Sequence, residues 1–352
     1  MTAVETRELA PGYSISRVVR GGWQLAGGHG LIDRDRALDD LIAAFDAGVF
    51  TFDCADIYTG VEELCCALRT RILATRGLEA AKGLKVHTKL VPDLSILQAI
   101  ERRDVEAIVD RSLRRLGMER LDLVQFHWWD YSEPRWLEAL GWLDDLRAKG
   151  KARLIGGTNF DARRVREILE AGVPLASMQV QYSVLDRRPE NGLAALCEAH
   201  GVGLLCYGSV AGGFLSDRWL GRPEPSGPLA NRSLVKYKLI IDDFGGWTLF
   251  QELLSALRRV ADRHGSDIAT VASRFALDLR GVAAVIVGAT SRAHLGANAA
   301  IGALRLSDSD REEIEAVAAR RKGPNGDVYE LERDREGRHG SIMKYNLNTE
   351  PA

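Results

Sequence analysis

Short apolar runs alternate along the chain with longer segments in which apolar residues recur every three or four positions. The short runs are rich in β-branched residues and are followed by turn residues, which is typical of strands. Several are apolar nearly throughout, and this indicates parallel strands covered by helices. The predicted strands span residues 16–19, 49–55, 85–91, 121–128, 153–160, 177–183, 203–209 and 284–289.

The longer segments predict amphipathic helices. The clearest spans residues 96–116, where Ile100, Val105, Ile108 and Leu116 lie on one side and charged residues fill the others. Gly117 follows directly, as expected at the C-terminus of a helix. The other predicted helices span residues 34–47, 61–70, 135–149, 161–171, 193–200, 247–264, 268–279 and 307–320.

Eight alternations of strand and helix favour a closed (β/α)₈ barrel with parallel strands, a TIM barrel, over a doubly wound sheet. A doubly wound sheet that binds a dinucleotide would be expected to have Gly-x-Gly-x-x-Gly after its first strand, and the sequence lacks this motif. We therefore predict a single α/β domain over residues 1–352, with the barrel over about 16–320.

Two segments do not follow the alternation. Residues 210–246, after the seventh strand, form a long segment rich in Gly and Pro, and residues 322–352 form a charged, glycine-rich tail. Long irregular segments in compact proteins are either lids over a site or disordered. We expect a lid at residues 210–246, and both alternatives stay open for the tail.

Composition excludes several classes of function. The 352 residues have a net charge of -2 and no basic block, so we expect no nucleic-acid partner. No apolar run reaches the roughly 20 residues that span a bilayer, and the polar start MTAVE is no secretory signal, so a cytoplasmic protein is expected. The five cysteines have no zinc-site spacing, and no metal is predicted. The sequence gives no indication of the oligomeric state.

Four ionisable residues lie where the predicted strands end. Asp53 ends the second strand, Tyr58 follows it in the loop, Lys89 ends the third strand and His127 ends the fourth. The carboxyl-terminal ends of barrel strands form the mouth where the chemistry of such barrels takes place. We therefore expect these four side chains to meet at one rim.

These residue types suit the reduction of a carbonyl group. Hydride transfer builds negative charge on the carbonyl oxygen, so a proton donor must lie within hydrogen-bond reach. A free tyrosine has a pKa of about 10, and a nearby ammonium lowers it. We expect Lys89 to act in this way on Tyr58, Asp53 to hold Lys89 charged, and His127 to supply a second donor to the substrate oxygen.

In these motifs the sequence resembles the aldo-keto reductase family, over roughly residues 16 to 320. The resemblance implies a catalytic tetrad of Asp53, Tyr58, Lys89 and His127 and an NAD(P)H-dependent reaction between nicotinamide and an aldehyde, ketone or alcohol. It also implies the cofactor-binding residues Gly22, Trp23, Thr158, Asn159, Gln179, Tyr207, Gly208, Val210, Gly212, Gly288, Ser291, Arg292, His294 and Asn298.

The sequence departs from the family pattern at two places. Tyr207-Gly208-Ser209-Val210 stands where the family often has Tyr-Ser-Pro-Leu, and His294 and Ala297 stand where members that prefer NADP(H) have basic and acidic or amide residues. Ser291 and Arg292 could still meet a 2′-phosphate at the start of the following helix. On this basis NADP(H) is favoured over NAD(H).

Aromatic residues near His127 are candidates for the substrate site. Trp23, Trp128 and Trp129 could line an apolar slot beside the nicotinamide, or they could simply cap the barrel. Two other classes of protein are alternatives to a reductase. One is a regulatory barrel subunit that binds nicotinamide with little turnover, and the other is a lyase or metal hydrolase, for which too few ligands are present.

Overall fold

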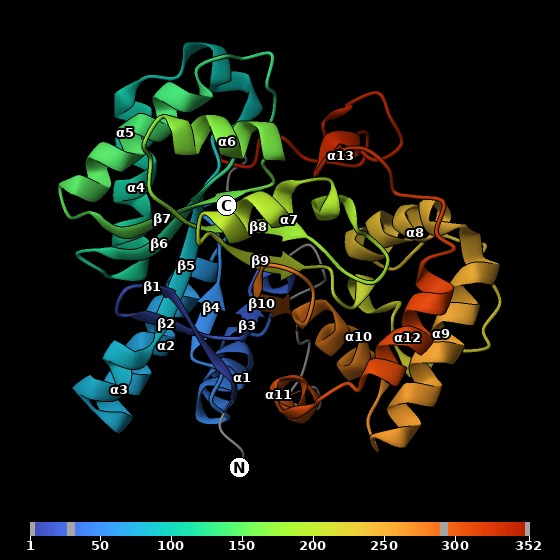
Figure 1. Ribbon diagram of the computed structural model, residues 1–352. Coiled ribbons are helices and arrows are strands. Elements are labelled where there is room, and N and C mark those ends of the chain that lie inside the picture. Colours follow the sequence, from blue (N-terminus) through green and yellow to red (C-terminus); the bar gives the residue numbers. More distant parts are fainter. Residues whose placement is uncertain (1–3, 27–31, 289–294, 349–352) are drawn as a thin grey trace.

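The computed structural model describes residues 4–26, 32–288 and 295–348. Eight parallel strands close into a barrel in the order β10-β3-β4-β5-β6-β7-β8-β9, so the predicted TIM barrel is confirmed (Figure 1). The barrel strands are β3 (Val18–Gly21), β4 (Thr51–Asp53), β5 (Lys85–Leu90), β6 (Leu121–Phe126), β7 (Ala152–Thr158), β8 (Leu175–Gln181), β9 (Gly203–Tyr207) and β10 (Val282–Val287).

The strand pairing aligns polar residues of neighbouring strands near the carboxyl-terminal end of the barrel. Lys89 of β5 pairs with Gln125 of β6, and Thr158 of β7 pairs with Gln179 of β8. Every residue of β8, Gln179 included, is buried, because the outer face of the strand lies under helices and its inner face fills the barrel. The parallel ladder thus brings polar residues at the carboxyl ends of successive strands to one level.

Helices surround the barrel (Figure 1), and among the described residues no helix is both long enough and apolar enough to cross a bilayer. The helices are α1 (Arg34–Asp46), α2 (Val61–Arg76), α3 (Leu78–Gly83), α4 (Arg102–Leu116), α5 (Trp136–Ala148), α6 (Ala162–Glu170), α7 (Leu193–Ala199), α8 (Arg232–Phe244), α9 (Gly246–Arg263), α10 (Ile268–Leu277), α11 (Leu295–Ala303), α12 (Asp308–Ala318) and α13 (Glu330–Arg333).

The predicted helix over residues 96–116 is wrong at its start. A short 3₁₀ segment, Leu94–Ala99, precedes α4, and Ile100 and Glu101 between them are not helical, with ψ of 135° and 166°. The Glu101 and Asp104 side chains form a capping box with each other's backbone, which starts α4 at Arg102. Gly117 ends the helix in the left-handed conformation, as the sequence predicted.

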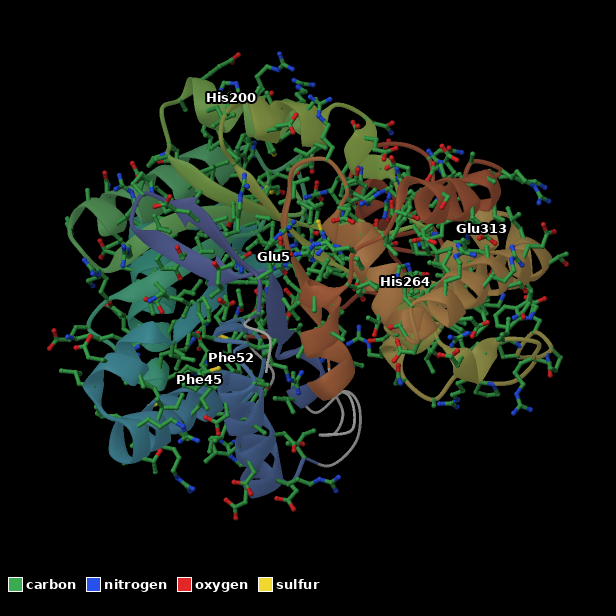
Figure 2. The ribbon with its side chains drawn as sticks, turned by 60° about the horizontal axis from the view of Figure 1, so that its bottom comes forward. Glu5, Phe45, Phe52, His200, His264 and Glu313 are labelled. Atoms are coloured by element: carbon green, nitrogen blue, oxygen red, sulfur yellow. The ribbon has the colours of Figure 1, made fainter. Side chains whose placement is uncertain are left out.

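A hairpin at the other end of the barrel was missed by the sequence analysis. Strands β1 (Thr6–Ala10) and β2 (Tyr13–Ser16) pair antiparallel across the amino-terminal end (Figure 2). Ser16 pairs with Thr6 in this hairpin, so the first barrel strand begins at Val18 and the prediction of residues 16–19 was displaced. The signal in the sequence was Pro11-Gly12, with Gly12 at φ 67° in the turn.

The segment 210–246 is not irregular throughout, because its second half is the helix α8. The Asn231 side chain accepts a hydrogen bond from the Leu234 amide and caps the helix. Leu234, Tyr237 and Ile241 are among the residues that α8 buries, at three- and four-residue steps. A cap followed by this period was readable in the sequence, but the preceding glycines and prolines obscured it.

The tail is packed against the barrel through residue 348 and, apart from α13, has no helix or strand in its described part. Glu332 of α13 is 1% exposed and accepts hydrogen bonds from Arg188 at 2.8 and 3.1 Å. Further along, the Asp93 carboxylate accepts the backbone amides of Leu347 and Asn348, each at 2.9 Å. The tail was expected to be either a lid over a site or disordered. Its described part is ordered and covers the barrel.

Candidate active site

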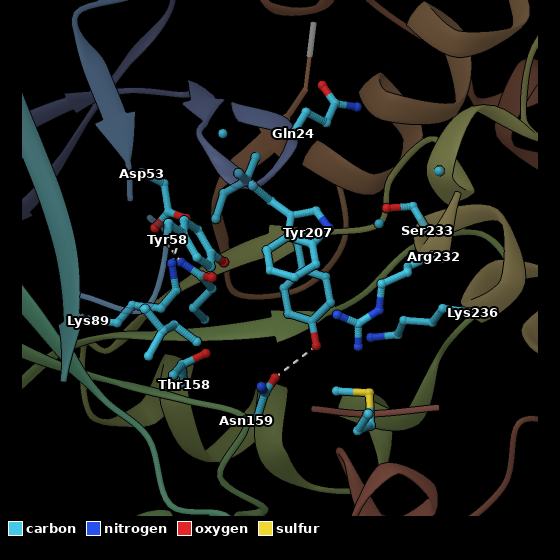
Figure 3. Close-up of a pocket in the computed structure, with 18 of the residues that line it drawn as sticks. Gln24, Asp53, Tyr58, Lys89, Thr158, Asn159, Tyr207, Arg232, Ser233 and Lys236 are labelled. Atoms are coloured by element: carbon cyan, nitrogen blue, oxygen red, sulfur yellow. Dashed lines mark hydrogen bonds and ion pairs between the residues drawn. The ribbon is translucent and has the colours of Figure 1, made fainter. Parts of the chain in front are cut away.

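A cavity of about 340 Å³ opens at the carboxyl-terminal mouth of the barrel (Figure 3). It falls within the size range of small-molecule sites. Strand ends supply one wall, and α8 and the tail supply the other. Its lining includes Trp23, Gln24, Asp53, Ile57, Tyr58, Lys89, Val91, His127, Trp129, Thr158, Asn159, Gln179, Tyr207, Gly208, Val210, Gly212, Arg232, Ser233, Lys236, Tyr237, Gly288, Tyr329, Ile342, Met343, Lys344 and Leu347.

The four predicted rim residues all line this cavity. Lys89 Nζ lies 2.7 Å from Asp53 Oδ2 and donates to the Cys54 carbonyl at 2.8 Å. The same ammonium is 5.0 Å from the centre of the Tyr58 ring, and Trp23 packs edge-on against that ring at 5.2 Å. The phenol, ammonium and carboxylate therefore form one contiguous group (Figure 3).

The expected lowering of the Tyr58 pKa is outweighed in the free protein. Burial raises the pKa of Tyr58 above its ordinary value, although the neighbouring Lys89 lowers it. For Lys89, burial favours the neutral amine, but the Asp53 carboxylate dominates and the pKa is raised. Tyr58 is thus a neutral phenol and Lys89 an ammonium at neutral pH. The expectation underestimated the cost of forming a phenolate among buried groups.

His127 has one ring nitrogen occupied and one without a partner. Its Nδ1 lies 3.1 Å from the Thr158 carbonyl oxygen, which can only accept, so this nitrogen bears the hydrogen. Burial lowers the pKa of His127 to about 3, which keeps the ring neutral. Nε2 is buried without a hydrogen-bond partner among the described residues. This tautomer makes Nε2 an acceptor, whereas a donor was expected from the sequence.

Amide side chains extend the group around Asp53. Gln179 Nε2 donates to Asp53 Oδ1 at 2.7 Å and to Gln125 Oε1 at 2.8 Å. Asn159 Oδ1 accepts from the Tyr207 hydroxyl at 2.8 Å (Figure 3). Among the described residues, Gln179 Oε1 and Asn159 Nδ2 make no hydrogen bond, so one acceptor and one donor of this set stay available. A carboxamide needs such a pair, and the residues fit a nicotinamide here.

Glycines near this wall have a packing reason of their own. Gly208 has φ 82°, and a Cβ there would lie 2.7 Å from the Tyr237 hydroxyl. Gly212 has φ 64°, and a Cβ there would lie 3.2 Å from the backbone of Ser233. Both glycines are therefore needed for α8 to approach the loop after β9, in addition to any cofactor contact.

Several predicted residues do not line the cavity. Trp128 is fully buried beside Phe126, and its indole nitrogen donates to main-chain carbonyls, so it is a core residue and not a wall of the substrate site. Gly22 lies against the backbone of Asp53, where a Cβ would meet an oxygen at 2.8 Å. Asn298 lies in α11 and is not among the residues that line the cavity. Residues outside the described part of the chain are Ser291, Arg292 and His294.

Residues of α8 and the tail also line the cavity, and these were not predicted from the sequence. Arg232, Ser233 and Lys236 lie across Tyr207 from the Asp53–Lys89 pair (Figure 3). Tyr329 and Leu347 of the tail also line the cavity. The period of α8 could have identified the first group. No periodic signal marks the tail residues, because their placement depends on individual contacts.

Comparison with known proteins agrees with this geometry. The family model Aldo/keto reductase family matches residues 17–319. The NADH-specific methylglyoxal reductase of Escherichia coli is 27% identical over 86% of this chain and 96% of its own length. Protein tas of the same species is 31% identical over 62% of this chain and 68% of its own. The glycerol dehydrogenase of Gluconobacter oxydans superposes with a TM-score of 0.75 at 23% identity, over 93% of this chain and 98% of its own.

A parallel barrel with a Tyr, Lys, Asp and His group at its mouth defines a class of nicotinamide-dependent oxidoreductases acting on carbonyl groups. The chain belongs to the aldo/keto reductase family. It is accordingly an NAD(P)H-dependent carbonyl oxidoreductase that takes a small-molecule substrate.

Proposed function

We propose that the protein transfers a hydride between nicotinamide and an aldehyde or ketone, or the corresponding alcohol, with Tyr58 as the proton donor and acceptor. The bound cofactor supplies or takes up the hydride. The observation that supports this most directly is the group in which Lys89, bonded to Asp53 at 2.7 Å, lies 5.0 Å from the centre of the Tyr58 ring in the cavity wall.

In the reductive direction Tyr58 gives its hydroxyl proton to the substrate oxygen as negative charge develops there. The Lys89 ammonium stabilises the phenolate that forms, and Asp53 keeps Lys89 charged and oriented. In the oxidative direction the phenolate takes the proton back. His127 Nε2, an acceptor in the tautomer described above, orients the hydroxyl of the alcohol.

We further propose that Asn159 and Gln179 bind the nicotinamide carboxamide through Nδ2 and Oε1, and that Tyr207 packs on the ring. Thr158, Val210, Gly208, Gly212 and Gly288 line the remaining cofactor wall. Ser291 and Arg292 are the reason to propose NADP(H) over NAD(H). The E. coli relative is named as NADH-specific, so both cofactors must be measured.

The substrate site is proposed to be apolar. Trp23 and Trp129 lie in the cavity wall, and the Trp129 ring is 4.3 Å from the His127 ring. Ile57, Val91 and Leu347 add aliphatic surface. An aromatic or aliphatic carbonyl compound would bury its apolar group there, and its carbonyl oxygen would face Tyr58.

A panel of aldehydes, ketones and alcohols, assayed with NADPH, NADH and their oxidised forms, tests this function. We expect measurable reduction of a generic aldehyde such as 4-nitrobenzaldehyde, and a higher kcat/KM with NADPH than with NADH. Cofactor binding, seen as quenched or shifted NADPH fluorescence, with no turnover across the panel would instead support a regulatory barrel that only binds nicotinamide. A higher kcat/KM with NADH would contradict the proposed cofactor preference alone.

A further inference from the structure

We propose that Arg333, in the tail, is a positioning residue that holds Asn159 in the geometry needed to bind the nicotinamide carboxamide. Arg333 lies beyond residue 319, where the match to the family model ends. The inference rests on the proposed function, because it takes Asn159 as a carboxamide contact.

One nitrogen of Arg333 links two loops of the catalytic rim. Its Nη2 donates to the carbonyl oxygen of Trp128 at 3.1 Å and to that of Asn159 at 2.9 Å. Trp128 follows His127 at the end of β6, and Asn159 follows β7. Hydrogen bonds from a charged donor are about twice as strong as neutral ones, so this link constrains both loops.

The Arg333 guanidinium is itself held between two aromatic rings. Its centre lies 4.1 Å from the ring of Tyr131 and 5.2 Å from that of Tyr329. The adjacent residue, Glu332, is fixed by its hydrogen bonds to buried Arg188. The position of Arg333 is therefore set by the tail and is not a chance surface contact.

The backbone of Asn159 needs such a constraint. It has φ 64°, a left-handed conformation that is uncommon for residues other than glycine, although asparagine tolerates it better than most. Its amide donates to the Gln179 carbonyl at 2.8 Å, its Oδ1 accepts from Tyr207, and its carbonyl accepts from Arg333. With these three groups fixed, Nδ2 is the polar group of Asn159 left for a ligand. Loss of Arg333 frees the carbonyl and lets the residue relax.

The test compares two ligands that differ only in the nicotinamide. NAD(P)⁺ and the matching ADP-ribose, with or without the 2′-phosphate, are titrated calorimetrically into the wild-type protein, Arg333→Met and Arg333→Lys. We expect Arg333→Met to bind NAD(P)⁺ about 3- to 10-fold more weakly, the range for the loss of one neutral hydrogen bond, here that from Asn159 Nδ2 to the carboxamide. Affinity for the ADP-ribose should change less than about twofold, since Asn159 does not contact that part. Arg333→Lys should recover part of the loss.

Arg335→Met is the matched control. Arg335 is exposed, and its ion pair with Asp130, at 3.4 Å, lies on the surface. It should bind both ligands as the wild type does. Equal weakening of both ligands by Arg333→Met, or no weakening of either, overturns the proposal. Asn159→Ala separates the two hypotheses: if it leaves NAD(P)⁺ affinity unchanged, the proposed carboxamide contact itself is wrong. None of these measurements requires turnover.

Discussion

The two walls of the cavity are built in different ways. On one wall, Asp53, Lys89 and Gln179 are placed by the barrel ladder, in which each strand fixes the level of the next. On the other wall, the tail is placed by single interactions, such as the Glu332–Arg188 pair and the Asp93 carboxylate that binds the backbone of residues 347 and 348. The reactive groups therefore depend on the periodic structure, whereas their cover depends on a few contacts. Loss of a tail contact that does not reach the site, such as the Glu332–Arg188 pair, should affect stability more than chemistry.

The largest effect is expected on the ladder-built wall. Tyr58→Phe removes the proton donor and should lower kcat about 10²- to 10⁴-fold, the usual contribution of general acid catalysis. Cofactor affinity and thermal stability should stay close to wild type, because the ring remains against Trp23. Tyr182→Phe is the matched control, since Tyr182 lies outside the cavity lining and its hydroxyl pairs with Glu190. Unchanged turnover in Tyr58→Phe would remove Tyr58 from the mechanism.

The next effect tests the tail wall. Glu332→Gln leaves Arg188, which is 2% exposed, without one of its two carboxylate partners. Breaking a buried ion pair in this way costs about 3–5 kcal/mol of unfolding free energy. Urea denaturation should detect the loss, and the exposed neighbour Glu336→Gln should lose less than about 0.5 kcal/mol. Equal stability of the two variants would mean that the tail is held by something other than this pair.

A smaller, pH-dependent effect should arise beneath the site. Burial lowers the pKa of His87 to about 4, so the folded protein binds fewer protons than the unfolded chain between about pH 4 and 6.5. This contribution to stability is complete above pH 6.5 and declines as the pH falls. Between pH 7 and 5, His87→Gln should lose about 2 kcal/mol less unfolding free energy than the wild type. The unfolding free energy of the control His200→Gln, a change at an exposed histidine, should depend on pH as that of the wild type does. If the unfolding free energy of His87→Gln also falls with pH as steeply as that of the wild type, buried His87 is not the cause of the loss.

The sequence was sufficient for the barrel and for the four rim residues, because strand period and strand ends are local signals. It was insufficient where a contact between distant residues decides the outcome. Trp128 looked equivalent to Trp129, yet only Trp129 reaches the cavity. The tautomer of His127 depends on the Thr158 carbonyl of the next strand. Nothing in the sequence distinguishes Arg333 from the other arginines. Its hydrogen bond to the Asn159 carbonyl is formed only in the folded protein.

The β1–β2 hairpin has a consequence for how the interior exchanges with water. Tyr13, fully buried, lies with its hydroxyl 3.2 Å from His87, the residue paired with Asp53 in the ladder. A buried phenol and a neutral imidazole therefore lie between the catalytic group and the amino-terminal end of the barrel. Because Tyr58 lines the cavity at the carboxyl-terminal mouth, we expect its proton to exchange with bulk solvent through that mouth. Exchange should then be slower when a ligand fills the cavity than when the cavity is empty.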